Sequence, residues 1–172
     1  MPITQPDWNI SRITRAHDRT AFASGQASLD AFLRTHVMQY EKRHLARTFV
    51  ATEPDEVPVA GYHTLANGAL DASFLQESLR KKLPRHPIPT LHLARLAVDL
   101  AYRGQRLGET WLFHALKLAI EMSGNTGIFG VDVWAIDAVA VGFYCKFGFM
   151  RLEDDPFHLL APMNSVEKMF GL

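Results

Sequence analysis

Disulfides are excluded within this chain of 172 residues, because it contains a single cysteine, Cys145. An excess of one charge sign is also absent, since 18 Lys and Arg residues balance 18 Asp and Glu residues. A net charge of zero does not by itself indicate a nucleic-acid partner. No run reaches about 18 apolar residues, which argues against a transmembrane helix, and the first 14 residues lack the apolar segment of a signal peptide. We therefore expect a cytoplasmic protein with no membrane partner, in which Cys145 is a buried structural thiol.

Metal-binding patterns are missing as well. The eight histidines form neither an HExxH motif nor a Cys/His spacing, so we expect no metal site. Hydrophobic residues make up 48% of the chain and charged residues 21%, a composition that excludes disorder. The length predicts one domain over residues 1–172.

The middle of the chain alternates strands with helices. Residues 90–100 are almost continuously apolar, which is typical of a strand covered on both faces. A helix over 105–122, a strand over 128–136 and a helix that begins after Asp137 and ends by Gly148 follow. The first of these helices is expected to bury Trp111, Ala115, Leu118, Ala119 and Met122.

The flanking segments predict hairpins and short helices. Ser28 is the predicted N-cap of a helix over 28–45, and Ser73 with Gln76 has the spacing of a capping box. The predicted strands are 8–14, 48–52, 59–70 and one or two within 151–163, the second and third of them paired as a hairpin. These elements together indicate an α/β (α+β) fold with a mixed sheet.

The turn from the apolar strand into the helix has the features of an anion site. Gly104 and Gly108 allow a ligand to approach the backbone closely, and Arg103 and Arg106 add positive charge. Free N–H groups at a helix N-terminus favour phosphate. Neither a GxGxxG nor a Walker motif is present, so an ordinary strand–helix turn remains an alternative.

Two segments resemble the GNAT family of N-acetyltransferases. Residues 93–112, LARLAVDLAYRGQRLGETWL, resemble the acetyl-CoA-binding segment, whose motif is Arg/Gln-x-x-Gly-x-Gly/Ala; Arg106 replaces the first motif glycine. Residues 142–149, GFYCKFGF, are similar to the family's FY-x-x-x-GF segment. The resemblance implies a GNAT fold with a central, twisted, mostly antiparallel sheet, splayed at the acetyl-CoA site between 96–98 and 128–136.

The N-terminal half resembles the acetyltransferase toxins of bacterial toxin–antitoxin pairs. The similarity lies in 24–51, 61–70, 93–99 and 155–163. It implies acetyl transfer from acetyl-CoA to the α-amino group of aminoacyl-tRNA, which blocks translation, together with a ribbon-helix-helix antitoxin and a homodimer. Two alternatives remain at this point: an acetyltransferase acting on a small amine or a protein N-terminus, and a non-catalytic acetyl-CoA-binding module.

The resemblance also implies roles for particular residues. Tyr144 would be the general acid near the thioester sulfur, weighed against a core aromatic. The acetyl-CoA contacts would come from Leu96, Ala97, Val98, Arg103, Gly104, Gln105, Arg106, Leu107, Gly108 and Glu109. No residue is an obvious general base, and Asp132 in an apolar strand is interpreted as a paired structural carboxylate. An α-amino group, with a reference pKa of about 7.7–8.0, needs less help from a base than a lysine.

Two basic clusters are candidates for contacts to tRNA phosphates. Their members are Arg34, Lys42 and Arg43, and Arg80, Lys81, Lys82 and Arg85. The alternative is that both clusters are solvated helix ends. Arg95, in the apolar strand, is expected to orient a substrate or to pair with an acid.

Overall fold

The computed structural model describes residues 7–172, and the first six residues of the N-terminal segment considered above lie outside this range. The chain forms two compact units. Unit 1 comprises the described residues up to Leu65 together with Arg95–Ala115, and unit 2 comprises Ala66–Ala94 and Leu116–Leu172. The prediction of a single domain over 1–172 remains a prediction.

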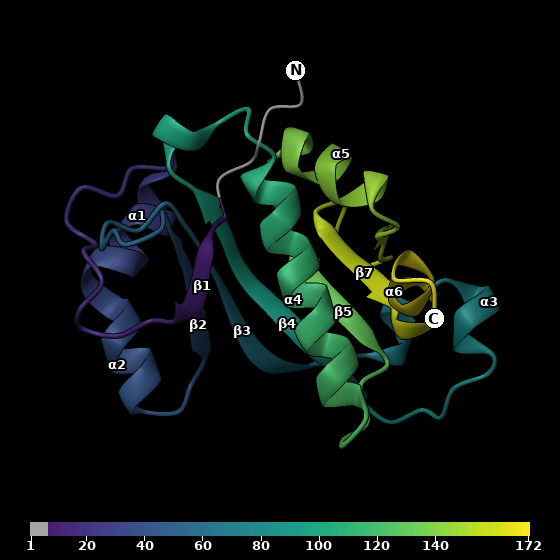
Figure 1. The fold of residues 1–172 in the computed structure, drawn as a ribbon. Helices are drawn as coiled ribbons and strands as arrows, with labels where there is room; N and C mark the ends of the chain where they lie inside the picture. The colour runs from purple at the N-terminus through teal and green to yellow at the C-terminus, as the bar shows by residue number, and fades with distance from the viewer. Residues whose placement is uncertain (1–6) are drawn as a thin grey trace. The chain divides into compact units, whose positions relative to one another are not determined.

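A mixed sheet runs through the fold (Figure 1). Its strand order is β1-β2-β3-β4-β5-β7-β6. The strands are β1 (Asn9–Arg12), β2 (Arg47–Thr52), β3 (Gly61–Leu70), β4 (Ile88–Val98), β5 (Gly130–Trp134), β6 (Met150–Arg151) and β7 (His158–Pro162). Four of the pairings, β1–β2, β2–β3, β5–β7 and β6–β7, are antiparallel, whereas β4 and β5 are parallel. The expected mixed, mostly antiparallel sheet and the expected hairpin are therefore confirmed.

The first helical segment of unit 1 is interrupted by a π-helical turn. It consists of α1 (Ala27–Ala31), the π turn η1 (Phe32–His36) and α2 (Val37–Lys42), which lies beside β2 (Figure 1). The predicted N-cap Ser28 is wrong, because Gln26 holds that position. Asp30 instead accepts hydrogen bonds from the backbone N–H and the hydroxyl of Ser24, at 2.9 and 2.6 Å. The buried face packs in a core of Ile13, Phe22, Phe32, Leu33, Val37, Val50, Val59, Tyr62 and Ala97.

Unit 2 has its own core and three short helices. The core contains Leu70, Leu75, Ile88, Leu152 and Leu160. Its helices are α3 (Glu77–Arg80), preceded by the 3-10 turn η2 (Ala72–Phe74), α5 (Ala138–Lys146) and α6 (Met163–Met169), which contacts β5 and β7. The helix predicted from Ser73 is wrong, because Asp71 caps the short turn by accepting from Ser73 N at 2.8 Å. The prediction for Asp137 is confirmed: its carboxylate accepts from Ala140 N at 2.8 Å.

The long helix α4 (Leu107–Ser123) begins in unit 1 and ends in unit 2. Its buried face consists of Leu107, Trp111, Leu112, Ala115, Leu116 and Ala119. Leu118 is only half-buried and Met122 is 37% exposed, so the prediction that the helix buries these two residues is wrong. In unit 1, Trp111 lies close to β3: a Cβ at Gly61 would lie 3.0 Å from its Nε1 atom.

Two further expectations concern the burial of Cys145 and the absence of a membrane-spanning helix. Cys145 is exposed, so the predicted buried thiol is wrong; α5 buries Val141 and Tyr144, and the next residue in the helix turns away from that face. Within residues 7–172, no helix has both the length and the apolar character needed to span a bilayer.

Candidate functional site

In unit 1 the loop before α4 contains two residues in the left-handed region of the backbone. Gly104 has a φ of +81°, and Arg106 has a φ of +58°. The left-handed region costs a residue with a Cβ about 1 kcal/mol or more, so Arg106 accepts a conformation that glycine adopts freely. The Arg106 carbonyl accepts from Thr110 N at 3.1 Å and so joins the loop to the first turn of α4.

The two motif glycines leave open space beside the backbone. A Cβ at Gly104 would meet no atom within 4 Å, and a Cβ at Gly108 would meet only Val98 Cγ2, at 3.9 Å. Packing in the protein alone does not require glycine at either position. The first N–H groups of a helix have no intrahelical partner, and they lie here beside an exposed loop, residues 103–106. The loop therefore fits an anionic group such as the diphosphate of coenzyme A.

The side chains of several predicted cofactor residues are already engaged in the protein. Leu107 is buried beside Trp111, and Leu96 and Val98 pack against the same cluster. Ala97 belongs to the other core cluster of unit 1. The Arg103 guanidinium donates to the Ser24 carbonyl at 3.2 Å. Any contact of the buried Ala97 and Leu107 with acetyl-CoA would therefore use the main chain, whereas the side chains of Leu96 and Val98 are only partly buried.

The parallel pairing of β4 with β5 is short. It extends from Thr90↔Gly130 to Leu93↔Val133 and includes no later residue of β4. Leu96, Ala97 and Val98 therefore lie beyond the paired part of the strand. Their N–H and C=O groups on that side are not used in this pairing, which is consistent with the expected splay.

Tyr144 lies in α5 of unit 2 and is 6% exposed. Phe143 and Phe149 surround its ring, each with its ring centre 5.3 Å away. Burial raises the pKa of the Tyr144 phenol above its usual range, so the hydroxyl keeps its proton at neutral pH. No hydrogen bond of that hydroxyl occurs among the residues that the structure describes. The geometry is compatible both with a proton donor and with a core aromatic.

Asp132 on β5 is the centre of a hydrogen-bonded network in unit 2. Its Oδ1 atom accepts from the Thr90 hydroxyl at 2.7 Å, and its Oδ2 atom lies 3.0 Å from both His92 Nδ1 and His158 Nε2. Burial by itself raises the pKa of the Asp132 carboxyl, but the hydrogen bonds from His92, His158 and Thr90 and the charge of His92 outweigh it and lower the pKa. The pairing expected for Asp132 is confirmed, and its structural role stays an interpretation.

Sequence reasoning missed the histidines of this network. The available signal was the period-2 pattern: Thr90 and His92 share one face of β4, and the register places Thr90 beside Gly130 and His92 beside Asp132. The network also explains Gly68, where a Cβ would lie 2.7 Å from the Thr90 hydroxyl oxygen. No cluster of three or more His, Cys, Asp or Glu residues suited to a metal ion occurs between residues 7 and 172.

The basic residues of unit 1 differ in how they are held. Arg34 donates to the Phe22 carbonyl at 3.1 Å, whereas Lys42 and Arg43 are exposed. The Arg95 guanidinium carbon lies 3.6 Å from the centre of the Phe32 ring and 5.8 Å from that of Tyr40. No ion pair of Arg95 occurs in the described part of the chain, so the expected pairing with an acid is wrong; a cation–π contact takes its place.

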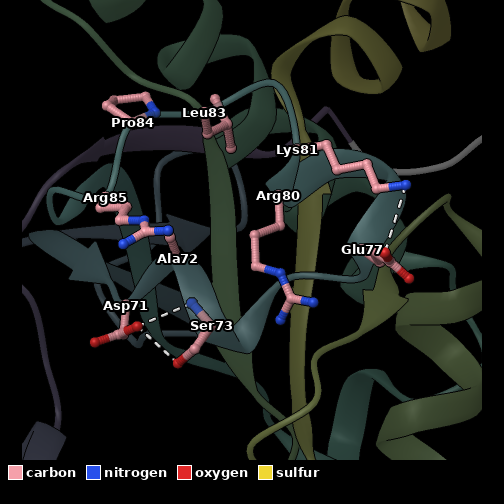
Figure 2. A pocket seen from close by; sticks show the side chains of 9 residues that line it. All are labelled: Asp71, Ala72, Ser73, Glu77, Arg80, Lys81, Leu83, Pro84 and Arg85. Atoms are coloured by element: carbon pink, nitrogen blue, oxygen red, sulfur yellow. Dashed lines mark hydrogen bonds and ion pairs between the residues drawn. The ribbon is translucent and has the colours of Figure 1, made fainter.

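The second basic cluster lines a pocket of about 530 Å³ in unit 2 (Figure 2). The lining comprises Asp71, Ala72, Ser73, Glu77, Arg80, Lys81, Leu83, Pro84 and Arg85. Lys81 lies 3.4 Å from Glu77, and Figure 2 shows its ammonium group turned toward that carboxylate. Arg80 and Arg85 have no ion-pair partner among residues 7–172. Lys82 is exposed and does not line the pocket.

Comparison with known proteins gives a consistent result. A model of the acetyltransferase (GNAT) family matches residues 18–149. A tRNA-acetylating toxin of Mycobacterium tuberculosis (strain ATCC 25618 / H37Rv) is 31% identical over 160 residues, which are 93% of this chain and 95% of that protein. The structure of AtaT complexed with acetyl-methionyl-tRNAfMet has a TM-score of 0.89 and 31% identity, and the match covers 95% of this chain and 99% of that chain. A tyrosine-to-phenylalanine mutant of KacT has a TM-score of 0.90 and 28% identity, with 95% and 99% covered. The mixed sheet, the glycine-bearing loop before α4 and the match over most of the chain agree, and the protein belongs to the acetyltransferase (GNAT) family.

Proposed function

We propose that the protein transfers the acetyl group of acetyl-CoA to the α-amino group of aminoacyl-tRNA and acts as the toxin of a toxin–antitoxin pair. The observation that carries this proposal is the similarity over 95% of the chain to AtaT complexed with acetyl-methionyl-tRNAfMet. The tRNA-acetylating toxin of Mycobacterium tuberculosis, similar over 93% of the chain, supports the same acceptor.

The loop and the strand of unit 1 would bind the acetyl donor. Acetyl-CoA supplies a thioester, whose acetyl group an amine can accept. The N–H groups of Gln105–Gly108 would hold the diphosphate, helped by the α4 dipole. The main chain of Leu96–Val98 would hold the pantetheine arm and polarise the thioester carbonyl. Glu109 is in the first turn of α4, where a carboxylate stabilises the helix, so its contact would also be through its N–H group.

Tyr144 would serve as the general acid. Its buried phenol stays protonated at neutral pH, so it can present a hydrogen to the leaving sulfur when negative charge develops there. A positioned acid of this kind contributes typically about 10²–10⁴-fold to the rate. The raised pKa also means that Tyr144 would not act as a base.

No described residue is needed as a strong base. Asp132 cannot easily serve, because Thr90, His92 and His158 already occupy its oxygens. An α-amino group has a reference pKa of about 7.7–8.0, so a useful fraction is neutral at pH 7, whereas a lysine amine at about 10.4 is almost fully protonated. The site chemistry therefore favours an α-amine acceptor over a lysine side chain.

Positive charge at the pocket of unit 2 would contact tRNA phosphates. Arg80 and Arg85 are the strongest candidates, because their guanidinium groups line the pocket without an acidic partner in the described chain. Lys81 is partly neutralised by Glu77. Lys42, Arg43 and Lys82 would add weaker, solvent-screened contacts. Arg34 and Arg95 are held by contacts within unit 1, and for them we propose only an indirect role.

One observation favours a second acceptor class. The net charge of zero is unusual for an RNA-binding surface, and it would suit an enzyme that acetylates a small amine or a protein N-terminus. The only support for a non-catalytic acetyl-CoA-binding module is that Arg106 replaces the motif glycine, and Arg106 adopts a left-handed φ of +58° that glycine also adopts.

We propose a partner protein, an oligomeric state and a location for this toxin, and a relative supports the first of them. A tyrosine-to-phenylalanine mutant of AtaT has been solved bound to the C-terminus of the antitoxin AtaR, which supports an antitoxin as the partner here, and we propose that it is a ribbon-helix-helix protein. We also propose a homodimer that acts in the cytoplasm, where charged tRNA is used. Light scattering of the purified protein, alone and with the protein encoded beside it, would measure both assemblies.

An acceptor panel tests the proposed function. The protein is incubated with radiolabelled acetyl-CoA and, separately, charged tRNA, deacylated tRNA, polyamines and peptides. We expect label on charged tRNA only, and its release as an N-acetylated amino acid after mild alkaline hydrolysis of the ester. Label on polyamines or peptides without label on charged tRNA would establish the second acceptor class instead.

A further inference from the structure

Trp134 is a large aromatic residue that stays exposed although one of its faces is covered. It is the last residue of β5 and is 50% exposed. Its ring stacks on the ring of His158, with centres 4.2 Å apart and planes 11° from parallel. The register of β5 and β7 places the two residues directly opposite each other. A half-exposed indole in a face-to-face stack presents a flat, apolar surface to solvent.

The His158 ring of this stack is held in place by buried contacts. His158 is 4% exposed, and its two ring nitrogens lie 3.0 Å from Asp132 Oδ2 and 2.8 Å from Asp154 Oδ2. These two contacts hold the ring in place, because a rotation of the ring would break both of them. Asp132 is itself held by Thr90 and His92. The ring on which Trp134 stacks is therefore held by a network of buried polar groups.

Trp134 also lies where a ligand would be expected in this part of the fold. The parallel pairs between β4 and β5 end at Leu93↔Val133, one residue before it. In open α/β sheets, ligands bind outside the carboxyl ends of the parallel strands, and β4 and β5 form a parallel pair here. Two further large apolar side chains are exposed nearby in the chain: Ile136, at 49%, and Phe157, at 41%, whose carbonyl accepts from Ala135 N at 2.8 Å.

The carboxylates around this surface favour the aminoacyl group of an aminoacyl-tRNA over its phosphate backbone. Glu153, Asp154 and Asp155 precede β7, and Asp154 contacts the same histidine as Trp134. Carboxylates repel phosphodiester groups, so the surface is unsuited to the RNA backbone. The aminoacyl group is the part of the acceptor that carries no phosphate. An aminoacyl side chain buries the most apolar surface against the indole when that side chain is itself large and apolar.

We infer that Trp134 is a specificity-determining residue that contacts the aminoacyl side chain of the acceptor and favours large apolar side chains over small ones. The inference rests on the proposed transfer to aminoacyl-tRNA. The interaction would be made by the free face of the indole, with His158, Asp132 and Asp154 acting as positioning residues for that ring.

The test compares one tRNA charged with methionine, phenylalanine, lysine, alanine or glycine. We expect wild-type kcat/KM to be about tenfold or more higher for the methionyl and phenylalanyl forms than for the glycyl form. Trp134→Ala should reduce that ratio to within about threefold of one, and Trp134→Phe should keep most of it. Val57→Ala removes an apolar side chain of similar exposure in unit 1, at 54%, and should leave the ratio unchanged.

The outcomes separate the inference from the proposed function. A ratio is insensitive to general loss of active protein, so reduced folding of Trp134→Ala does not imitate the expected result. Three outcomes would overturn the side-chain assignment while transfer to tRNA stands. They are an unchanged ratio in Trp134→Ala, a wild-type preference for the lysyl form, and an equal loss of kcat/KM for all five aminoacyl groups. The last of these is what stacking of Trp134 on a shared nucleobase would produce. A wild-type protein that acetylates none of the five forms overturns both.

Discussion

The Nε2 atom of His63 lies 2.8 Å from the Nδ1 atom of His114, and both rings belong to unit 1. His63 is fully buried, stacked on Phe49 with ring centres 5.3 Å apart and edge-on to Trp111 at 5.1 Å. Burial, followed by the charge of His114, lowers the pKa of His63 to about 3. His63 is thus neutral in the folded protein at any pH at which the enzyme would work.

The lowered pKa of His63 predicts that the folded protein loses stability in mild acid. The unfolded chain binds a proton at His63 near pH 6.5, and the folded chain does so only near pH 3. The stability is therefore complete above about pH 6.5 and falls as the pH drops toward 3, by at most about 1.4 kcal/mol per pH unit from this group. Urea unfolding between pH 4.5 and 7.5 measures the slope. His63→Asn should reduce it, and the exposed His36→Gln should not; equal slopes in all three proteins would contradict the prediction.

Tyr144→Phe should separate binding from turnover. The substitution removes only the hydroxyl and keeps the ring contacts with Phe143 and Phe149. We expect the dissociation constant for acetyl-CoA, measured by calorimetry, to stay within about twofold, whereas kcat falls about 10²–10⁴-fold. Tyr40→Phe, a hydroxyl deletion in α2, is the matched control and should keep wild-type kcat. A Tyr144→Phe enzyme with wild-type kcat would remove Tyr144 from the mechanism.

Two substitutions at Arg106 distinguish its backbone from its side chain. Both Arg106→Gly and Arg106→Ala remove the guanidinium, but only glycine relieves the left-handed φ of +58°. The glycine variant should therefore be more stable than the alanine variant by about 1 kcal/mol in urea unfolding. If the main chain holds the diphosphate, both variants should bind acetyl-CoA within about threefold of wild type. A loss of tenfold or more in both would show that the Arg106 side chain carries the binding.

Charge reversal in the unit 2 pocket should affect tRNA and spare acetyl-CoA. Arg80→Glu with Arg85→Glu replaces the two pocket guanidinium groups that lack an acidic partner in the described chain (Figure 2). We expect a higher KM for charged tRNA and a slope of log K against log salt concentration that is smaller by about two. Lys82→Glu, one position outside the pocket lining, is the control and should have a smaller effect. An unchanged KM for tRNA in the double variant would assign the cluster to solvation alone.

Local signals in the sequence predicted much of the fold. The apolar run before Arg103, the loop with Gly104 and Gly108 and the helix that follows are all present, with boundaries shifted by about two residues. Asp137 caps α5 as predicted, because an N-cap needs only the residues of its own turn. Local reasoning failed at Ser28, because Gln26 holds the N-cap position, and at Ser73, whose N–H and hydroxyl both donate to the nearby Asp71.

What the sequence alone determined is the order of the elements, the glycine-bearing loop before α4 and the family, since each depends on neighbours within a few positions of the chain. The tertiary structure decided which groups meet across the sheet and which face solvent. Asp132 finds its histidines 40 and 26 positions away, Arg95 packs on Phe32 and Tyr40 instead of on an acid, and Cys145 turns outward. Such contacts depend on strand register and helix rotation, and these are set by burial of the core as a whole, not by any short segment.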